Sequence, residues 1–399
     1  MTTTNNVLKP ITNSDPVQKA KDALLAVRKY QQDWQDYGVD RVNRYFDDVE
    51  GKWLEEFCAE PLTFEDVSPL IDINFIFKSL EIMGLPNSFV EEFIFPSWWK
   101  SALENDNSSI HNLQNLIISV SDRLMLNIDF ASEKSLFVFK EIPNLRYGLQ
   151  KNINETGIFI RIATSIARHI SRLVLKNYIP ISNNPQLVRD SILKKRPCID
   201  LDGLLYFCWE HGIPVVHPSI YVQQKIKGMS RFGGMVAMYQ NNPVIVIGSV
   251  TQKSETLLSF CLAHELGRIA CGHLRNGILV DELFSDELID AERTEADAFA
   301  TSLLFGNVTL LWREKLNSKK LYLEAIRLST IYKVSSSLVV LNYAWQTKDW
   351  RAAMTVLKKL EPEANAPKKI NAFLNQYIQP QNIDADSRDF LRRMNILAS

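Results

Sequence analysis

The chain has 399 residues, of which 46% are hydrophobic and 23% are charged, and its 45 Lys and Arg against 46 Asp and Glu give a formal net charge of -1. This balance excludes a protein that coats nucleic acid over its whole surface and leaves only a local basic patch for that purpose. The apolar fraction excludes a disordered or fibrous chain and predicts a globular protein with a real core, and the length favours two or three domains.

The five cysteines are odd in number, form no Cys-x-x-Cys pair and mostly stand in apolar runs. We therefore expect free thiols in a reducing compartment and no disulfide framework. The start of the chain lacks the basic and apolar segments of a secretory signal. The longest apolar run, residues 257–274, is interrupted by His264, Glu265 and Arg268, which favours a buried helix over a membrane span. We expect a cytoplasmic protein without a membrane partner.

The N-terminal half is predicted to be mainly helical. Residues 1–15 are rich in Thr, Asn, Ser and Asp and are expected to form a disordered tail, which leaves 16–195 as a helical region. Apolar residues at helical spacing predict helices from residue 17 to about 60, over 110–127 and over 156–178.

Four basic residues, Arg161, Arg168, Arg172 and Lys176, fall on one face of the predicted helix 156–178, and the opposite face carries isoleucine and valine. Such a row of cations could contact the phosphates of a nucleic acid. An ordinary solvated face is the alternative that we favour, because amphipathic helices carry their charges on the side away from the core.

The middle of the chain, residues 196–310, combines strands with helices. Apolar runs bounded by glycine, proline and asparagine predict short strands, and helical periodicity predicts helices around them. The elements are a helix at 199–211, strands at 213–217, 235–239 and 244–247, a central helix at 254–273, and a helix at 288–305. The acid-rich segment 281–290 is expected to be a solvated loop, although its carboxylates could also hold a cation.

Residues 311–399 are expected to form a helical C-terminal region. The segments 320–332 and 337–345 show helical periodicity with a short turn between them, which is the pattern of a helix-turn-helix. Further helices are predicted at 349–360, 371–377 and 387–396. The predicted fold class is therefore α+β: a small sheet with packed helices, flanked by mainly helical N- and C-terminal regions.

The central helix and the helix after it carry the residues with the clearest chemistry. His264 and Arg268 stand one turn apart on one face, and Glu295 is expected to share an apolar face with Phe299. A buried carboxylate normally faces a cation. A histidine and a glutamate from two packed helices can hold zinc with one position kept for water, and Glu265 could take the proton of that water as general base.

Four segments of the middle region carry a family resemblance. They are Gly212-Ile213-Pro214-Val215, Val244-Ile245-Val246-Ile247, Leu262-Ala263-His264-Glu265-Leu266-Gly267 and Glu295-Ala296-Asp297-Ala298-Phe299-Ala300. Together they make residues 198–306 resemble the ImmA/IrrE family of bacterial metallopeptidases. The resemblance implies a zincin-like core in which two histidines and a glutamate hold zinc, and it assigns His264 and Glu295 as ligands and Glu265 as the catalytic base.

The same resemblance implies that the substrate is a specific partner protein, such as a transcriptional repressor of phage-related or stress genes. In such enzymes the substrate lies extended along an edge strand, and we expect the sheet that precedes the central helix to supply this strand.

Arg268 occupies the position at which a helix of the form His-Glu-x-x-His carries its second histidine. A guanidinium has donors only and cannot ligate zinc, so weak zinc binding or none is expected. His273 does not replace the missing ligand, because its spacing from His264 places it on the far side of a regular helix. Arg268 is instead expected to pair with Glu295, Glu265 or both, and so to supply the charge of the zinc.

Two explanations of Arg268 are open: a natural pseudoenzyme, or a substitution that inactivates an active parent. The otherwise complete motif favours the second. The leading prediction is a zinc metalloendopeptidase acting on one partner protein, in a form inactivated by Arg268. The alternatives are a non-catalytic regulatory or binding protein on the same scaffold, such as an antitoxin or a phage-defence component, and a DNA-binding regulator that uses the basic face.

Overall fold

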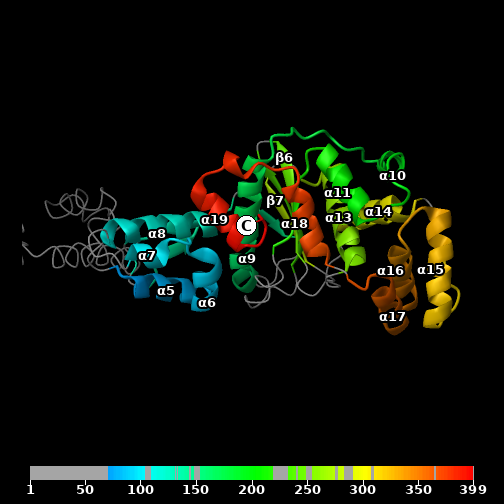
Figure 1. Ribbon diagram of the computed structural model, residues 1–399, viewed down its shortest axis with the longest axis horizontal. Helices are drawn as coiled ribbons and strands as arrows, with labels where there is room; N and C mark the ends of the chain where they lie inside the picture. The colour runs from blue at the N-terminus through cyan, green and yellow to red at the C-terminus, as the bar shows by residue number, and fades with distance from the viewer. Residues whose placement is uncertain are drawn as a thin grey trace, which may run out of the picture. The chain divides into compact units, whose positions relative to one another are not determined.

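The computed structural model describes residues 71–103, 109–130, 132, 134–142, 145–147, 153–218, 232–239, 241–248, 254–274, 277–282, 291–306, 310–363 and 365–398. The fold is α+β, with a small sheet among helices and helical regions before and after it in the sequence (Figure 1). The tail predicted at 1–15 and the helix predicted from residue 17 lie outside these ranges. Contacts divide the chain into two compact units: the first holds the residues up to Val90 with Ser97–Asp122 and Leu126–Lys140, and the second holds Glu91–Pro96, Arg123–Met125 and Glu141–Ser399.

The first unit combines short helices with a two-stranded antiparallel sheet. Its elements are α5 (Ile73–Ile82), α6 (Asn87–Phe89), α7 (Trp99–Leu103), most of α8 (Ser109–Leu124), β1 (Leu126–Ile128) and β2 (Phe137–Phe139). The helix predicted at 110–127 ends earlier, because Met125 has a left-handed φ of 51° and β1 follows at once. The Ser79 hydroxyl accepts a hydrogen bond from the N–H of Leu136 at 2.9 Å and ties α5 to the segment before β2.

The second unit is built on a five-stranded mixed sheet with the order β3-β7-β5-β6-β4. The strands are β3 (Leu145–Tyr147), β4 (Val215–Val216), β5 (Phe232–Tyr239), β6 (Asn242–Ile247) and β7 (Ile278–Glu282). β5 runs antiparallel to both β6 and β7, whereas β3 is parallel to β7 and β4 is parallel to β6. The three predicted strands are confirmed as β4, β5 and β6. β3 and β7 are additions that the sequence pattern did not predict.

Helices cover both faces of this sheet. α9 (Ile153–Leu173) and α13 (Glu255–Ala270) pack on β5 and β6, and α11 (Leu201–Glu210) packs beside β4. α14 (Ala291–Phe305) packs on α13, and α10 (Pro185–Leu193) packs on α14 and α11. On β5, the Met235 sulfur lies 3.8 Å from the hydroxyl of Thr164 in α9, whereas Gly234 lies against α13 at Glu265. Neighbouring strand residues face opposite sides, so α9 and α13 pack on opposite faces (Figure 1).

The C-terminal region consists of α15 (Ser318–Tyr332), α16 (Ser336–Thr347), α17 (Trp350–Leu360), α18 (Ala366–Asn375), the short 3-10 helix η5 (Pro380–Asn382) and α19 (Ala385–Arg393). The five α-helices each begin at a side chain that accepts an N–H hydrogen bond from the first turn, namely Asn317, Ser335, Asp349, Asn365 and Asp384. The predicted helices are confirmed, with α18 and α19 beginning earlier than expected. α18 packs beside β4, and the core around α13 continues into α15, α16 and α17 across the boundary predicted at residue 310.

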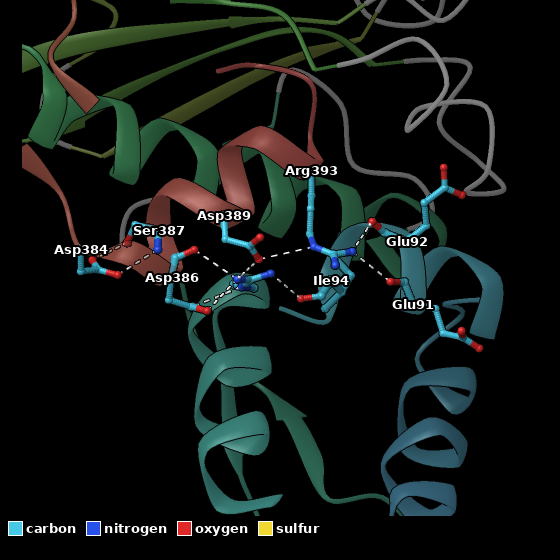
Figure 2. A network of polar contacts seen from close by, with 9 residues as sticks. Glu91, Glu92, Ile94, Asp384, Asp386, Ser387, Asp389 and Arg393 are labelled. Carbon is cyan, nitrogen blue, oxygen red and sulfur yellow. Dashed lines mark hydrogen bonds and ion pairs between the residues drawn. The ribbon is translucent and has the colours of Figure 1, made fainter. Parts of the chain in front are cut away.

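A buried arginine, Arg123 in the last turn of α8, ties α19 to Ile94 of the π-helix η2 (Val90–Ile94). It donates to the two carboxylate oxygens of Asp386 at 2.6 and 3.2 Å, to Asp389 at 2.9 Å and to the carbonyl oxygen of Ile94 at 2.9 Å (Figure 2). The side chains of Asp386 and Asp389 are 35% and 22% exposed, so the carboxylates lie at the edge of solvent. The pairing anchors the last helix of the chain to the second unit.

Candidate functional site

Helix α13 carries His264, Glu265 and Arg268, and all three side chains are buried. Helix α14 approaches α13 closely at Gly267, where a Cβ would lie 2.9 Å from the carbonyl oxygen of Ala296. Glycine permits this approach because it has no side chain. The contact fixes the residues around Ala296 relative to those on α13, so the two helices position one set of polar groups.

Arg268 is fully buried and forms a bidentate ion pair with Asp281 of β7. Its Nε donates to Oδ2 at 3.0 Å, and its Nη2 donates to Oδ1 at 2.6 Å. The carboxylate of Glu292 in the first turn of α14 lies 3.9 Å from Nη1. Sequence analysis predicts Glu295 or Glu265 as the partner of Arg268, and the hydrogen-bonded partner is Asp281 instead. The reason is strand β7, which brings a carboxylate within reach of the planar fork of the guanidinium.

Each ring nitrogen of His264 lies next to a carboxylate. Nδ1 lies 2.7 Å from Oδ1 of Asp297 in α14, and Nε2 lies 3.4 Å from Oδ2 of Asp281. Burial alone would lower the pKa of His264, but the hydrogen bonds to Asp281 and Asp297 outweigh it and raise the pKa from 6.5 to about 9. Both ring nitrogens therefore already have a carboxylate partner, and this arrangement favours the protonated ring.

Glu265 lies buried against strand β5. A Cβ at Gly234 would overlap its Oε1, so only glycine leaves room for this carboxyl group. Burial and then the charge of Asp281 raise the pKa of Glu265 to about 8, against the opposing charges of two neighbouring cations. Burial would also raise the pKa of Asp281, but His264 and Arg268 outweigh it and lower the pKa to about 2. The two shifts favour the charge on Asp281 and the proton on Glu265.

Glu295 is not part of this cluster. Its side chain is 62% exposed, and its Oε2 lies 2.9 Å from Nε2 of His273, just beyond the end of α13. The buried face of α14 is formed by Ala296, Phe299 and the residues one turn further on. The prediction that Glu295 shares the buried face with Phe299 is therefore wrong, because the helix turns its carboxylate outward. Burial, followed by the charge and hydrogen bond of Glu295, raises the pKa of the Cys271 thiol, which is the third member of this second group.

The predicted zinc ligands, His264 and Glu295, do not meet. His264 is engaged by two aspartates, Glu295 faces His273, and Arg268 shares Asp281 with His264. A zinc ion at His264 would meet a guanidinium where it needs a second ligand, and the carboxylate of Glu295 faces His273 instead, so these residues do not fit the predicted metal site. The chemistry that the His264 cluster offers is charge balance between buried ions.

The sheet does have an edge strand that precedes the central helix, namely β4, but Glu265 lies against a different strand. β5 is the strand that Glu265 contacts, and it pairs with β6 on one side and β7 on the other. The outer strands in the described ranges are β3 and β4, and α18 packs beside β4. A peptide therefore cannot extend the sheet at β5, because both of its edges are already paired.

The four residues of the predicted basic face have different surroundings. Arg161 donates to a main-chain carbonyl oxygen at 2.9 Å, Arg168 is half-buried, Arg172 is exposed, and Lys176 lies beyond the end of α9. Burial raises the pKa of Tyr239 to about 12, and the charges of Arg168 and Arg172 oppose this rise, so both arginines lie near that tyrosine. Of the four, Arg172 alone is exposed, which weakens the case for a row of phosphate contacts.

Asp281 and Asp297 are the site residues that sequence analysis missed. The acid-rich composition of 281–290 predicts a loop, but Asp281 is a buried residue of β7, and residues 283–290 lie outside the described ranges. The apolar run Ile278-Leu279-Val280 before it is a signal for a buried strand that could have found it. Asp297 lies in the same short motif as Glu295, on the side of α14 that meets His264.

No α-helix in the described ranges combines the length and the apolar character that a membrane span requires. Compared with known proteins, the chain matches no family model and no curated protein sequence. The resemblance to a peptidase family therefore rests on the sequence motifs themselves.

Proposed function

We propose that this chain is a cytoplasmic, ImmA/IrrE-like protein that does not hydrolyse peptides and acts as a regulatory or binding component toward a protein partner. The observation that supports this function is the buried ion pair between Arg268 and Asp281 beside His264. A cation that cannot ligate zinc stands where the second histidine is expected, and a buried carboxylate already balances its charge.

The position of Glu295 also supports a non-catalytic role. Its side chain is 62% exposed and faces His273, so it does not meet His264, the other predicted zinc ligand. A zinc site at His264 therefore lacks its glutamate as well as its second histidine.

A second candidate is a zinc metalloendopeptidase whose activity the arginine has removed. The observation that favours it is the close fit of Glu265 against Gly234. Asp281 is already the ion-pair partner of Arg268, so the pair does not need a second buried carboxyl group. A carboxyl group whose pKa is raised by burial and a neighbouring charge is typical of a catalytic site.

Three forms of the full chain separate the two candidates: the unaltered protein, Arg268→His, and Arg268→His combined with Glu265→Gln. Each would be incubated with zinc and a peptide mixture prepared from a whole proteome, and with the proteins encoded next to this chain, and cleavage would be read by mass spectrometry. We expect no cleavage by the unaltered chain, and a partner that co-elutes with it uncut in gel filtration. Zinc-dependent cleavage by the unaltered chain would contradict the proposal. Cleavage by Arg268→His alone, lost with Glu265→Gln, would identify an active parent enzyme.

A further inference from the structure

A second group of chemically active side chains lies at the C-terminal end of α13. Cys271, His273 and Glu295 offer a sulfur, an imidazole nitrogen and a carboxylate oxygen that all lie within 4.8 Å of one another. Within the described ranges, it is the one trio of possible metal ligands that comes together in this way. Neither the His264 cluster nor the proposed function uses it.

The end of α13 fixes the first two members of this trio. Cys271 caps the helix, and Gly272 after it has a left-handed φ of 73°. The N–H of Gly272 donates to the carbonyl oxygen of Ile269 at 3.1 Å, and the N–H of His273 donates to that of Arg268 at 3.0 Å. This pair of bonds is the Schellman arrangement, which locks the chain just after a helix. Cys271 and His273 are therefore held by backbone hydrogen bonds and do not belong to a loose loop.

The third member is placed by the packing of the two helices. Glu295 directly precedes Ala296, whose main chain approaches α13 at Gly267 so closely that a Cβ there would lie 2.9 Å from the Ala296 carbonyl oxygen. Gly267 is one turn before Cys271 on α13. The same contact that joins the helices therefore sets the position of Glu295, and it leaves Oε2 2.9 Å from Nε2 of His273.

We propose that Cys271, His273 and Glu295 bind a zinc ion, which cross-links the end of α13 to α14. Thiolate, imidazole and carboxylate are ligands that zinc takes, and three protein ligands leave a fourth position for water. Zinc bond lengths of about 2.0 to 2.3 Å separate tetrahedral ligands by about 3.5 Å, so the side chains need only small rotations. His273 is buried, Cys271 is half-buried and Glu295 is 62% exposed, which gives an ion access from solvent.

The donor set favours zinc over calcium or magnesium. Both of those ions select oxygen ligands, whereas a thiol and an imidazole suit the softer transition metals. The alternative is a plain ion pair between His273 and Glu295, with Cys271 as a bystander. The two cases differ in one observable, because only a metal site requires the sulfur.

Cobalt(II) is the probe that detects the sulfur directly. Titrated into the metal-free full chain, it should bind one equivalent and give the near-ultraviolet charge-transfer band of a cobalt–thiolate bond, and zinc should then displace it. Cys271→Ser should abolish the band. Glu295→Gln should weaken binding by at least about tenfold, in line with losses seen when groups around a metal are removed. Zinc should raise the melting temperature of the unaltered chain but not that of Cys271→Ser.

Two matched variants serve as controls. Cys198→Ser removes another half-buried thiol, and Asp297→Asn neutralises a carboxylate of the same helix that contacts His264 instead. Both should keep the band. The proposal is overturned if cobalt gives no thiolate band, if Cys271→Ser keeps it, or if Asp297→Asn removes it while Glu295→Gln does not. None of these outcomes depends on whether the chain cleaves peptides, so this test stands apart from that of the proposed function.

Discussion

Two arginines, Arg123 and Arg268, are the largest fully buried side chains of the described residues, and their partners differ. Arg123 reaches two aspartates of the C-terminal helix that are 35% and 22% exposed, together with a main-chain carbonyl group (Figure 2). Arg268 reaches Asp281, whose side chain is only 7% exposed, in a strand inside the sheet, and His264 shares that carboxylate.

The difference lies in what happens when the arginine is removed. The carboxylates around Arg123 lie next to solvent, so water can hydrate their charge when the arginine is removed. Asp281 has no such access, and losing Arg268 would leave its buried charge with only the longer contact to His264, which is the costly case. The two arginines therefore differ in their effect on stability because their partner carboxylates differ in exposure. Arg123 holds a terminal helix in place, whereas Arg268 neutralises a charge inside the core.

The largest expected effect is that of removing Arg268. Arg268→Ala should lower the free energy of unfolding by about 3 to 5 kcal/mol, the cost of breaking a buried pair. Urea denaturation followed by circular dichroism measures it. A loss below about 1 kcal/mol, the size expected of a surface pair, would show that Asp281 is solvated and would remove the contrast with Arg123.

The fold around these arginines was largely predictable from the sequence. Regular periodicity identified α13, α14 and the strands β5 and β6, because their apolar residues repeat as helices and strands require. β7 was missed because Asp281 and Glu282 sit at its end and resemble the acid-rich segment that follows. β3 has three residues, too few for a pattern to be visible.

The candidate site was only partly predictable. The motif placed His264, Glu265 and Arg268 together on one helix, as the structure has them. The partner of Arg268 comes from a strand paired through non-local contacts, and no spacing along the chain encodes that. The orientation of Glu295 depends on where α14 turns its buried face, and a small error in helical phase moves a carboxylate from the core to solvent.

The second expected effect is a pH dependence that the Arg268 cluster should show. His264 has a folded pKa of about 9 against an ordinary 6.5, so its contribution to stability is complete below pH 6.5 and is lost as the pH rises to 9. Glu265, with a folded pKa of about 8 against 4.5, acts in the same direction, because its contribution is complete below pH 4.5 and is lost as the pH rises to 8. The His264 shift alone corresponds to roughly 3 kcal/mol.

Denaturation at pH 6.5, 7.5, 8.5 and 9 would measure this loss. Asp297→Asn removes one of the two carboxylates that hold the proton on His264 and should flatten the slope. A stability that rises through this pH window, or a slope that Asp297→Asn leaves unchanged, would show that His264 is not an imidazolium in the folded protein.

A smaller effect is expected from Arg123→Ala, at about 2 kcal/mol, within the range for hydrogen bonds to charged groups. The carboxylates left behind regain water, so the buried-charge penalty is avoided. Asp386→Asn should cost less still, because it keeps the shape of the side chain. If Arg123→Ala lowers the free energy of unfolding as much as Arg268→Ala does, the exposure of the partner carboxylates does not determine the loss.

The smallest expected effect is that of salt. Raising sodium chloride from about 0.1 to about 1 M shortens the Debye length from about 10 to about 3 Å, which screens pairs at the edge of solvent more than buried ones. The cost of Arg123→Ala should fall by about 0.5 kcal/mol, within the range for exposed pairs, and that of Arg268→Ala should stay the same. If salt changes the loss of stability equally for Arg123→Ala and Arg268→Ala, the two ion pairs are equally exposed to solvent.

A double-mutant cycle would measure directly whether Arg268 and Asp281 act as partners in a buried ion pair. Arg268→Met, Asp281→Leu and the combination of both would be compared with the unaltered chain by urea denaturation, because apolar side chains of similar volume can replace a buried pair. We predict that the double variant loses about 3 kcal/mol less than the two single variants together. If the losses add to within about 0.5 kcal/mol, the two side chains act independently and do not form such a pair.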